Sequence, residues 1–228
     1  MNGIDQERIR TQFDTIAAHY DAGRRCLIPC FDDYYVRSVS VVKNLKPQAA
    51  NIVDLGAGTG LLTQQMYQLY PQSRFTLIDL SDEMLAVARQ RFQGLPNVEC
   101  RVADYTAEIP EGAELICSAL SIHHLENVEK QQLYQAVYEA LPEGGVFVNL
   151  DQFCAESPHI NEAWDEWWQH YIDHSGITDD AKAKWRERKK LDREVSMAET
   201  HAMLRAAGFQ HVACIYQFMK FGTVVALK

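Results

Sequence analysis

The sequence predicts an α/β fold of three layers, in which helices cover both faces of a largely parallel sheet. Between residues 50 and 150, short apolar strands alternate with stretches of helical periodicity, and the first strand runs directly into a glycine-rich turn, Gly56-Ala-Gly-Thr-Gly60. Strands that alternate with helices of about 10–15 residues form parallel sheets, because right-handed crossovers return each strand to the same direction. Overall composition agrees with such a globular core.

The chain has 228 residues, 22 of them Lys or Arg and 31 Asp or Glu, which gives a formal net charge of −9. Its 47% hydrophobic content is enough for a packed core and excludes wholesale disorder. The acidic balance argues against binding nucleic acid or an anionic membrane through a basic face. No apolar run approaches the roughly 20 residues of a membrane-spanning helix, no secretory signal is visible, and six scattered cysteines without a CxxC pair suit reduced thiols. We therefore expect a cytoplasmic protein.

The elements follow from periodicity and from proline and glycine stops. Apolar residues at steps of three to five predict a helix over residues 4–20, and a second helical stretch covers 31–45. Helices are also expected at 61–70, behind Ser81 as an N-cap, at 128–141 and at 196–208. Strands are expected at 51–55, 74–79, 98–102, 114–120, 146–150, 211–219 and 223–227.

These elements predict a single domain over residues 1–228. Residues 1–46 form an N-terminal helical cover and residues 50–150 a cofactor-binding core. Residues 151–195 interrupt the alternation and hold all four tryptophans, which predicts a helical lid insertion, and residues 196–228 supply a closing helix and strand pair.

The glycine turn favours one class of ligand over another. The three glycines are spaced G-x-G-x-G, and Leu61 occupies the position where a dinucleotide fingerprint has its third glycine. A pyrophosphate also needs cationic help at the helix N-terminus, but no Lys or Arg lies between Asp54 and Arg74. The turn therefore predicts a ligand with a nucleoside and a small zwitterionic tail.

Acidic residues at the ends of the next two strands support this prediction. Asp79 ends the second strand, 19 residues after Gly60, where a carboxylate can accept both ribose hydroxyls. Asp104 and Tyr105 end the third strand, where the carboxylate can accept from an adenine amino group and the ring can pack on the base. Ligands of parallel sheets bind at this carboxyl edge.

Together these motifs resemble those of class I S-adenosylmethionine-dependent methyltransferases of the small-molecule type, over roughly residues 10–228. The segments that carry the resemblance are VDLGAGTG (53–60), LIDLS (77–81), VADYT (102–106), SALSIHHL (118–125), PEGGVFV (142–148) and AGF (207–209). The resemblance implies a Rossmann-like seven-stranded sheet, mostly parallel with an antiparallel last strand, and S-adenosyl-L-methionine as cofactor. The residues it implies for cofactor binding are Tyr20, Asp54, Gly56, Ala57, Gly58, Gly60, Asp79, Leu80, Asp104, Tyr105, Ser118 and Ala119.

The implied reaction needs little chemical activation by the protein. The methyl group of a sulfonium is already electrophilic, so the protein has to hold the acceptor in line with it, and a base is needed only when the acceptor arrives protonated. His123 and His124 follow the fourth strand and Asp151 follows the fifth, so these three are the candidate catalytic residues. The alternative is that the histidines cap a turn and pack against the sheet.

The lid insertion is the expected acceptor site. Its substrate candidates are Trp164, Trp167, Trp168 and Tyr171, which recur at steps of three and four on one helical face. The stripe can equally seal the lid onto the core.

The basic run 182–190 fits a solvated helix face. Arg24 and Arg25 fit surface positions or a contact to a carboxylate.

No metal site is predicted, because His159, His170 and His174 do not complete a fixed ligand set. The predicted function is methyl transfer from S-adenosylmethionine to a small-molecule acceptor. Two alternatives stay open: an enzyme like the carboxy-S-adenosylmethionine synthases, which modify the cofactor and use an arginine to hold the added carboxylate, and a non-catalytic S-adenosylmethionine-binding protein. We expect no nucleic-acid or membrane partner, and a homodimer through the helical additions is open.

Overall fold

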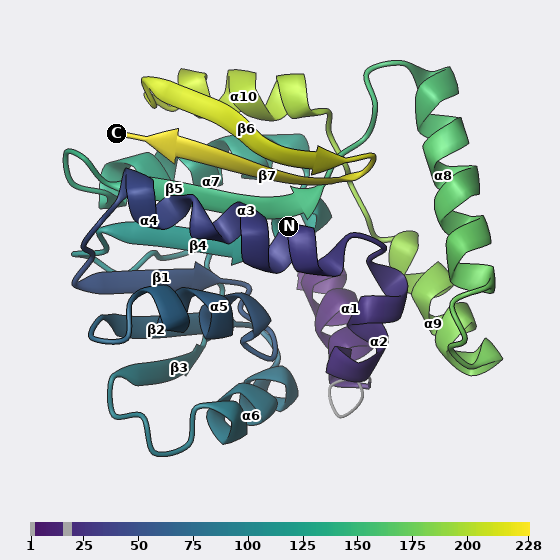
Figure 1. Ribbon diagram of the computed structural model, residues 1–228, viewed down its shortest axis with the longest axis horizontal. Coiled ribbons are helices and arrows are strands. Elements are labelled where there is room, and N and C mark those ends of the chain that lie inside the picture. Colours follow the sequence, from purple (N-terminus) through teal and green to yellow (C-terminus); the bar gives the residue numbers. More distant parts are fainter. Residues whose placement is uncertain (1–2, 16–19) are drawn as a thin grey trace.

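The computed structural model describes residues 3–15 and 20–228, and a seven-stranded sheet forms its centre (Figure 1). The strand order is β3-β2-β1-β4-β5-β7-β6, with β1 to β5 parallel and β7 antiparallel to both of its neighbours. The strands are β1 (Asn51–Leu55), β2 (Arg74–Asp79), β3 (Val98–Val102), β4 (Leu115–Ala119), β5 (Val146–Gln152), β6 (His211–Phe218) and β7 (Phe221–Leu227). The predicted fold class is confirmed, and each strand lies within two residues of its predicted bounds.

The strand order fixes where a ligand can bind. From β1 the chain moves outward to β2 and β3, and then returns to the other side of β1 as β4. The connections that leave β1 and β4 therefore diverge to opposite sides of the sheet. At such a switch point the carboxyl ends of the two strands leave a crevice between them.

Helices cover the two faces of the sheet (Figure 1). One face packs against α5 (Leu61–Leu69), α6 (Asp82–Arg91) and a helical run made of η2 (Asp33–Arg37), α3 (Ser38–Ser40) and α4 (Val42–Leu45). The other face packs against α7 (Asn127–Ala140) and α10 (Met197–Ala206). Turn η3 (Ile122–His124) follows β4.

Alternation along the strands decides which face each side chain reaches. Leu77 and Val148 pack with Met66 and Tyr34 on the first face, and Phe147 packs with Val137 on the second. All of these side chains have no more than 1% of their surface exposed. Each fully buried aliphatic side chain contributes about 1.5–3 kcal/mol, so the two clusters together hold the sheet rigid beneath the site.

Four helices lie beyond the carboxyl ends of the parallel strands (Figure 1). They are α1 (Gly3–Asp14) and α2 (Tyr20–Leu27), which form the N-terminal cover, and α8 (Pro158–Asp173) and α9 (Asp179–Lys189), which form the lid. The sequence predicted one helix over residues 4–20. Instead, α1 ends at Asp14 and a separate helix begins at Tyr20, while residues 16–19 lie outside the described ranges.

The lid is anchored to the rest of the molecule by buried groups. The indole N–H of Trp168 in α8 donates to the carbonyl of Leu27 at 2.8 Å, and the Trp168 side chain is only 4% exposed. Lys220, buried in the turn before β7, forms ion pairs with Asp165 of α8 at 3.2 Å and with Glu194. The lid therefore belongs to the packed structure and fixes the end of α2.

The N-terminal cover is attached through polar contacts. Thr59 in the glycine turn donates to Asp21 of α2 at 2.6 Å, and Arg91 of α6 forms an ion pair with the same carboxylate. Ser81 donates to Asp14 of α1 at 2.5 Å. Within the described ranges, no helix is both long and apolar enough to cross a membrane.

Candidate active site

A first cavity lies at the switch point, between the carboxyl ends of the strands and the N-terminal cover. It encloses about 820 Å³, counting its open mouth, a size that suits a small-molecule site. Of the twelve residues predicted to bind the cofactor, the cavity is lined by Tyr20, Asp54, Gly56, Ala57, Gly58, Asp79, Leu80, Asp104, Tyr105 and Ala119. The remaining two, Gly60 and Ser118, lie behind its walls.

The glycine turn presents backbone to this cavity. Gly58 has a φ of +55°, and a Cβ there would meet only the end of Met84 within 4 Å, so this position leaves room for a ligand. Gly60 serves a different purpose, because a Cβ on it would lie 2.6 Å from the ring of Phe92. Ser118 donates to the carbonyl of Leu55 at 2.7 Å and ties β4 to β1.

Asp79 braces the glycine turn and still has capacity for a ligand. One of its oxygens accepts from the backbone N–H of Gly58 at 2.8 Å, and the other accepts from Ser81 at 2.9 Å. The backbone N–H of Leu80 is a further donor to this carboxylate. A carboxylate can accept about four hydrogen bonds, so it keeps acceptor capacity for a ligand beside the cavity. At the end of β3, Asp104 accepts from Thr106.

Asp54 is a buried acid with one oxygen free. Its side chain is 1% exposed, and Oδ2 accepts from Thr63 at 2.6 Å. Its Oδ1 is buried without a hydrogen-bond partner among the described residues. Burial, with a smaller contribution from the charge of Asp79, raises the pKa of Asp54 to about 7. A cationic group entering the cavity would stabilise the ionised form.

A second cavity adjoins the first and is closed by the lid. It encloses about 440 Å³ and shares Phe13, Leu120 and His124 with the first cavity. The lid contributes Trp168 and Trp185. Charged side chains on its lining are Arg24, His123, Arg188, Lys189 and Asp192.

The tryptophan stripe divides between two environments. Trp168, one of the four predicted substrate residues of the lid, lines the second cavity. Trp164, Trp167 and Tyr171 line neither cavity, and the Trp167 ring, 38% exposed, stacks on Tyr171 and meets Phe218 edge-on at 5.6 Å. The lid face that the sequence singled out therefore points mostly toward the tip of β6.

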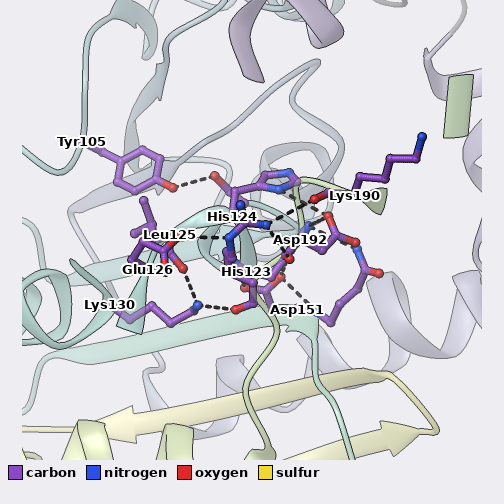
Figure 2. A network of polar contacts seen from close by, with 12 residues as sticks. Tyr105, His123, His124, Leu125, Glu126, Lys130, Asp151, Lys190 and Asp192 are labelled. Carbon is purple, nitrogen blue, oxygen red and sulfur yellow. Dashed lines mark hydrogen bonds and ion pairs between the residues drawn. The ribbon is translucent and has the colours of Figure 1, made fainter. Parts of the chain in front are cut away.

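Figure 2 shows the polar network behind the second cavity, centred on His123. The Nδ1–H of His123 donates to Asp151 at 2.5 Å, the backbone N–H of His123 donates to the same carboxylate at 3.0 Å, and Nε2 lies 3.4 Å from Asp192. Burial alone would lower the pKa of His123, but the two carboxylates outweigh it and raise the pKa to about 10. His123 is therefore an imidazolium at neutral pH and has no free lone pair with which to accept a proton.

His124 has the opposite character. Burial and the charge of His123 lower the pKa of His124 to about 3, so its imidazole is neutral. Its Nδ1 lies 3.4 Å from Asp192 but makes no hydrogen bond among the described residues. Because His124 lines both cavities, it is the neutral base nearest to their junction. Asp151 lines neither cavity, and its carboxylate is hydrogen-bonded to His123.

Sequence reasoning missed the contribution of the lid's exit. The segment after α9 returns to η3, where the backbone N–H of Arg193 donates to His123 at 2.7 Å and buried Lys130 donates to the carbonyls of Leu125 and Arg193. This places Asp192 against both histidines. The sequence does carry a signal for this arrangement. Trp185, Arg188 and Asp192 are spaced by three and four residues, which places them on one face of a helix that covers the basic run 182–190 and the two residues after it.

The same cluster has the composition of a metal site. One ligand atom from each of His123, His124 and Asp192 lies within 4.8 Å of the others. However, His123 is already protonated between two carboxylates, and Arg24 and Arg188 line the same cavity. The local charge therefore disfavours a cation at this cluster.

Comparisons with known proteins agree with this geometry. Residues 52–145 match the family described as a methyltransferase domain. Curated relatives at 21–27% identity are named carboxy-S-adenosyl-L-methionine synthase; the one from Nautilia profundicola is 21% identical, over 95% of this chain and 94% of its own length.

Among solved structures, the DhpI-SAM-HEP complex is similar over the full length of both chains, with a TM-score of 0.67 and 20% identity. Human N-acetylserotonin methyltransferase in complex with SAM has a TM-score of 0.60 and 20% identity, over 84% of this chain and 51% of that one.

The charge state of His123 gives a first prediction. Its pKa in the folded protein lies near 10, above the ordinary value of 6.5. The stabilisation that its charge provides is therefore fully present below pH 6.5 and is lost as the pH rises through about 10. We expect NMR titration of the His123 ring to show protonation up to about pH 9, and a lower pKa in Asp151→Asn, which removes the closest carboxylate. A wild-type ring that titrates near its ordinary pKa would contradict this assignment.

Proposed function

We propose that this chain, a class I S-adenosylmethionine-dependent methyltransferase, binds S-adenosylmethionine in the first cavity and transfers its methyl group to a small molecule in the second. The observation that carries the proposal is the junction of the two cavities at Phe13, Leu120 and His124. Transfer from a sulfonium requires donor and acceptor in line at contact distance. Two adjoining cavities with shared walls can supply that arrangement.

The first cavity fits the proposed cofactor. The unpartnered Oδ1 of Asp54 suits the ammonium of a methionyl tail, and the open face of Gly58 lets that tail approach the backbone. The remaining acceptor capacity of Asp79 suits the ribose hydroxyls. Asp104 and Tyr105, at the end of β3, would bind the adenine. Lys and Arg side chains are few on this cavity, with Arg10 of α1 on its lining, which fits a cofactor without phosphate.

The protein's own contribution is positional. When bound, the cofactor supplies an electrophilic methyl group, and the cover and lid exclude water and hold the acceptor. Such positioning is worth up to about 7–11 kcal/mol of the barrier. We assign to His124 the role of accepting a hydrogen bond or proton from the acceptor, since its imidazole is neutral and lines both cavities. His123 and Asp151 would position this turn and would not act as bases.

A second candidate function is modification of the cofactor itself. The names of the curated relatives favour it, because the Nautilia profundicola protein aligns over nearly all of both chains and is named carboxy-S-adenosyl-L-methionine synthase. On this alternative, the second cavity would hold the molecule that donates the carboxyl group. Identity of 21–27% supports the shared scaffold more than a shared substrate.

Product analysis separates the two functions. Protein incubated with S-adenosylmethionine and a panel of small acceptors should release S-adenosylhomocysteine in step with a methylated product. Mass spectrometry of the ligand retained by the purified protein should then show S-adenosylmethionine or S-adenosylhomocysteine. A retained ligand that is heavier than S-adenosylmethionine by one carboxyl group would favour the synthase. Binding without turnover over a broad panel would favour a non-catalytic role.

Asp79→Ala tests the cofactor site. Each hydrogen bond to a charged group contributes about 1.5–3 kcal/mol, so loss of two should weaken S-adenosylhomocysteine binding by at least about 100-fold. Isothermal titration calorimetry measures this affinity. Asp82→Ala is the matched control, because Asp82 lies three residues away, is 66% exposed and pairs with Arg89. Wild-type affinity in Asp79→Ala would remove the basis of the proposal.

Asp54 should make cofactor binding depend on pH. Its pKa lies near 7 in the empty cavity, and an ammonium beside it favours the carboxylate. The affinity for S-adenosylhomocysteine should therefore rise between pH 6 and 8 as Asp54 ionises, and binding below about pH 7 should release a proton. Calorimetry in buffers of different ionisation enthalpy detects that proton. Asp54→Asn should bind more weakly and without this pH dependence; a wild-type affinity that is flat over this range speaks against the contact.

A further inference from the structure

We propose that the molecule in the second cavity is a small anion, whose carboxylate, phosphonate or similar oxyanion binds between Arg24 of the N-terminal cover and Arg188 of the lid. This inference rests on the proposed function and names its substrate class. The two guanidinium groups come from helices far apart in the sequence, α2 and α9, and both line the second cavity.

Arg24 differs from its neighbour in forming no ion pair within 4.0 Å with any residue of the described ranges. Its guanidinium lies 3.9 Å from the centre of the Tyr20 ring, and its Nε is buried without a hydrogen-bond partner among the described residues. Arg25, one residue along the same helix, is exposed and forms an ion pair with Asp32 at 2.8 Å. Of the two adjacent arginines, only Arg24 points into a cavity.

Arg188 stands out in the same way within the basic run of the lid. Arg186 pairs with Asp173 at 2.6 Å, Lys190 pairs with Glu187 at 2.6 Å, and Lys189 pairs with Asp165. No ion pair or side-chain hydrogen bond joins Arg188 to any residue in the described ranges. The basic run was expected to be a solvated face, but Arg188 and Lys189 both line the second cavity, and of these two Lys189 has a carboxylate partner.

The remaining charges around the cavity compensate this pair only in part, because the charge of Asp192 attracts both arginines but is a single carboxylate. Asp192 is the carboxylate on the lining, and it is shared with the imidazolium of His123. Lys189 is neutralised by Asp165. Burial lowers the pKa of both arginines, and the charge of Arg188 contributes to the shift at Arg24. Two half-buried cations that repel one another are best stabilised by an anion between them.

The chemistry of the pair and the cavity limits the size and class of the ligand. A guanidinium presents a planar fork of donors that matches the oxygens of a carboxylate or phosphonate. Trp168 and Trp185 on the lining of the second cavity favour a small apolar or aromatic remainder.

A third cavity between the cover and the lid, of about 1,090 Å³ with its open mouth, shares Arg24, Leu27 and Arg188 with the second. It provides a route from solvent past both arginines. A divalent cation at His123, His124 and Asp192 is the competing occupant. The positive charges of Arg24, Arg188 and the His123 imidazolium make binding of a divalent cation there electrostatically unfavourable.

Matched ligand pairs test the inference at constant ionic strength. With the protein saturated by S-adenosylhomocysteine, thermal stability is measured against benzoate and benzamide, and against methylphosphonate and its neutral dimethyl ester. The anions should raise the melting temperature in a concentration-dependent manner and the neutral partners should not, because a ligand stabilises the state that binds it.

Variants then locate the anion. Arg24→Gln and Arg188→Gln should each weaken the apparent anion affinity by about 10- to 100-fold, and Arg24→Lys should fall between Gln and wild type because it keeps the charge but loses the fork. Arg25→Gln and Arg186→Gln, on the same two helices, are the controls and should respond like the wild type. Arg188→Gln and the two control variants should keep wild-type affinity for S-adenosylhomocysteine, which shows that they fold. Because Arg24 packs on Tyr20 of the first cavity, folding of the Arg24 variants is checked by circular dichroism instead.

Any of the following outcomes overturns the inference: an equal response to benzamide and benzoate, an anion response that survives in both glutamine variants, or stabilisation by Zn²⁺ or Mg²⁺ that Asp192→Asn removes. A protein that binds S-adenosylhomocysteine but no anion also overturns it, and leaves the proposed function standing. A wild-type protein that does not bind S-adenosylhomocysteine overturns the proposed function instead.

Discussion

The charged pairing of His123 with Asp151 and Asp192 is the interaction on which the geometry of the second cavity depends. It joins three segments that are distant in the sequence: the turn after β4, the end of β5 and the segment that follows α9. A buried ion pair is costly to form, and its main effect is to select one arrangement of the groups around it. The backbone bond from Arg193 to His123 and the buried Lys130 complete this junction. Burial and the charge of His123 keep the neighbouring His124 neutral, and His124 lines both cavities.

The shape of the first cavity depends on a different set of contacts, which join backbone N–H groups to carboxylates. Asp79 holds the glycine turn from the adjacent strand, so the shape of the turn depends on β2 as well as on its own glycines. The result is an acid-rich cavity beside a cation-rich one. A zwitterionic, positively charged cofactor and an anionic acceptor would each be drawn to its own cavity by charge alone, which lowers the chance that either occupies the wrong position.

The fold and the first cavity could be predicted from the sequence because their signals are local. Strand periodicity, the G-x-G-x-G spacing and acids at strand ends each lie within a few residues, and the parallel topology brings them to one edge. The second cavity could not be predicted in the same way. Arg24 and Arg25 look alike in sequence, and only the packing of α2 against the lid turns one inward. Likewise, nothing local distinguishes Trp168 from Trp167, or shows that Gly60 faces Phe92. Such distinctions arise from contacts between elements far apart in the chain.

Helix α2 links access to the two cavities. Tyr20 on this helix closes the first cavity, and Arg24, one turn further on, closes the second. The far end of the helix is fixed, since the carbonyl of Leu27 accepts the indole hydrogen bond of Trp168, whereas its beginning is held by the more exposed Asp21 contacts to Thr59 and Arg91. A swing about the Leu27 end would uncover both compartments in one movement. Entry to both cavities and exit from them would then depend on the same movement of α2, while the lid stays in place.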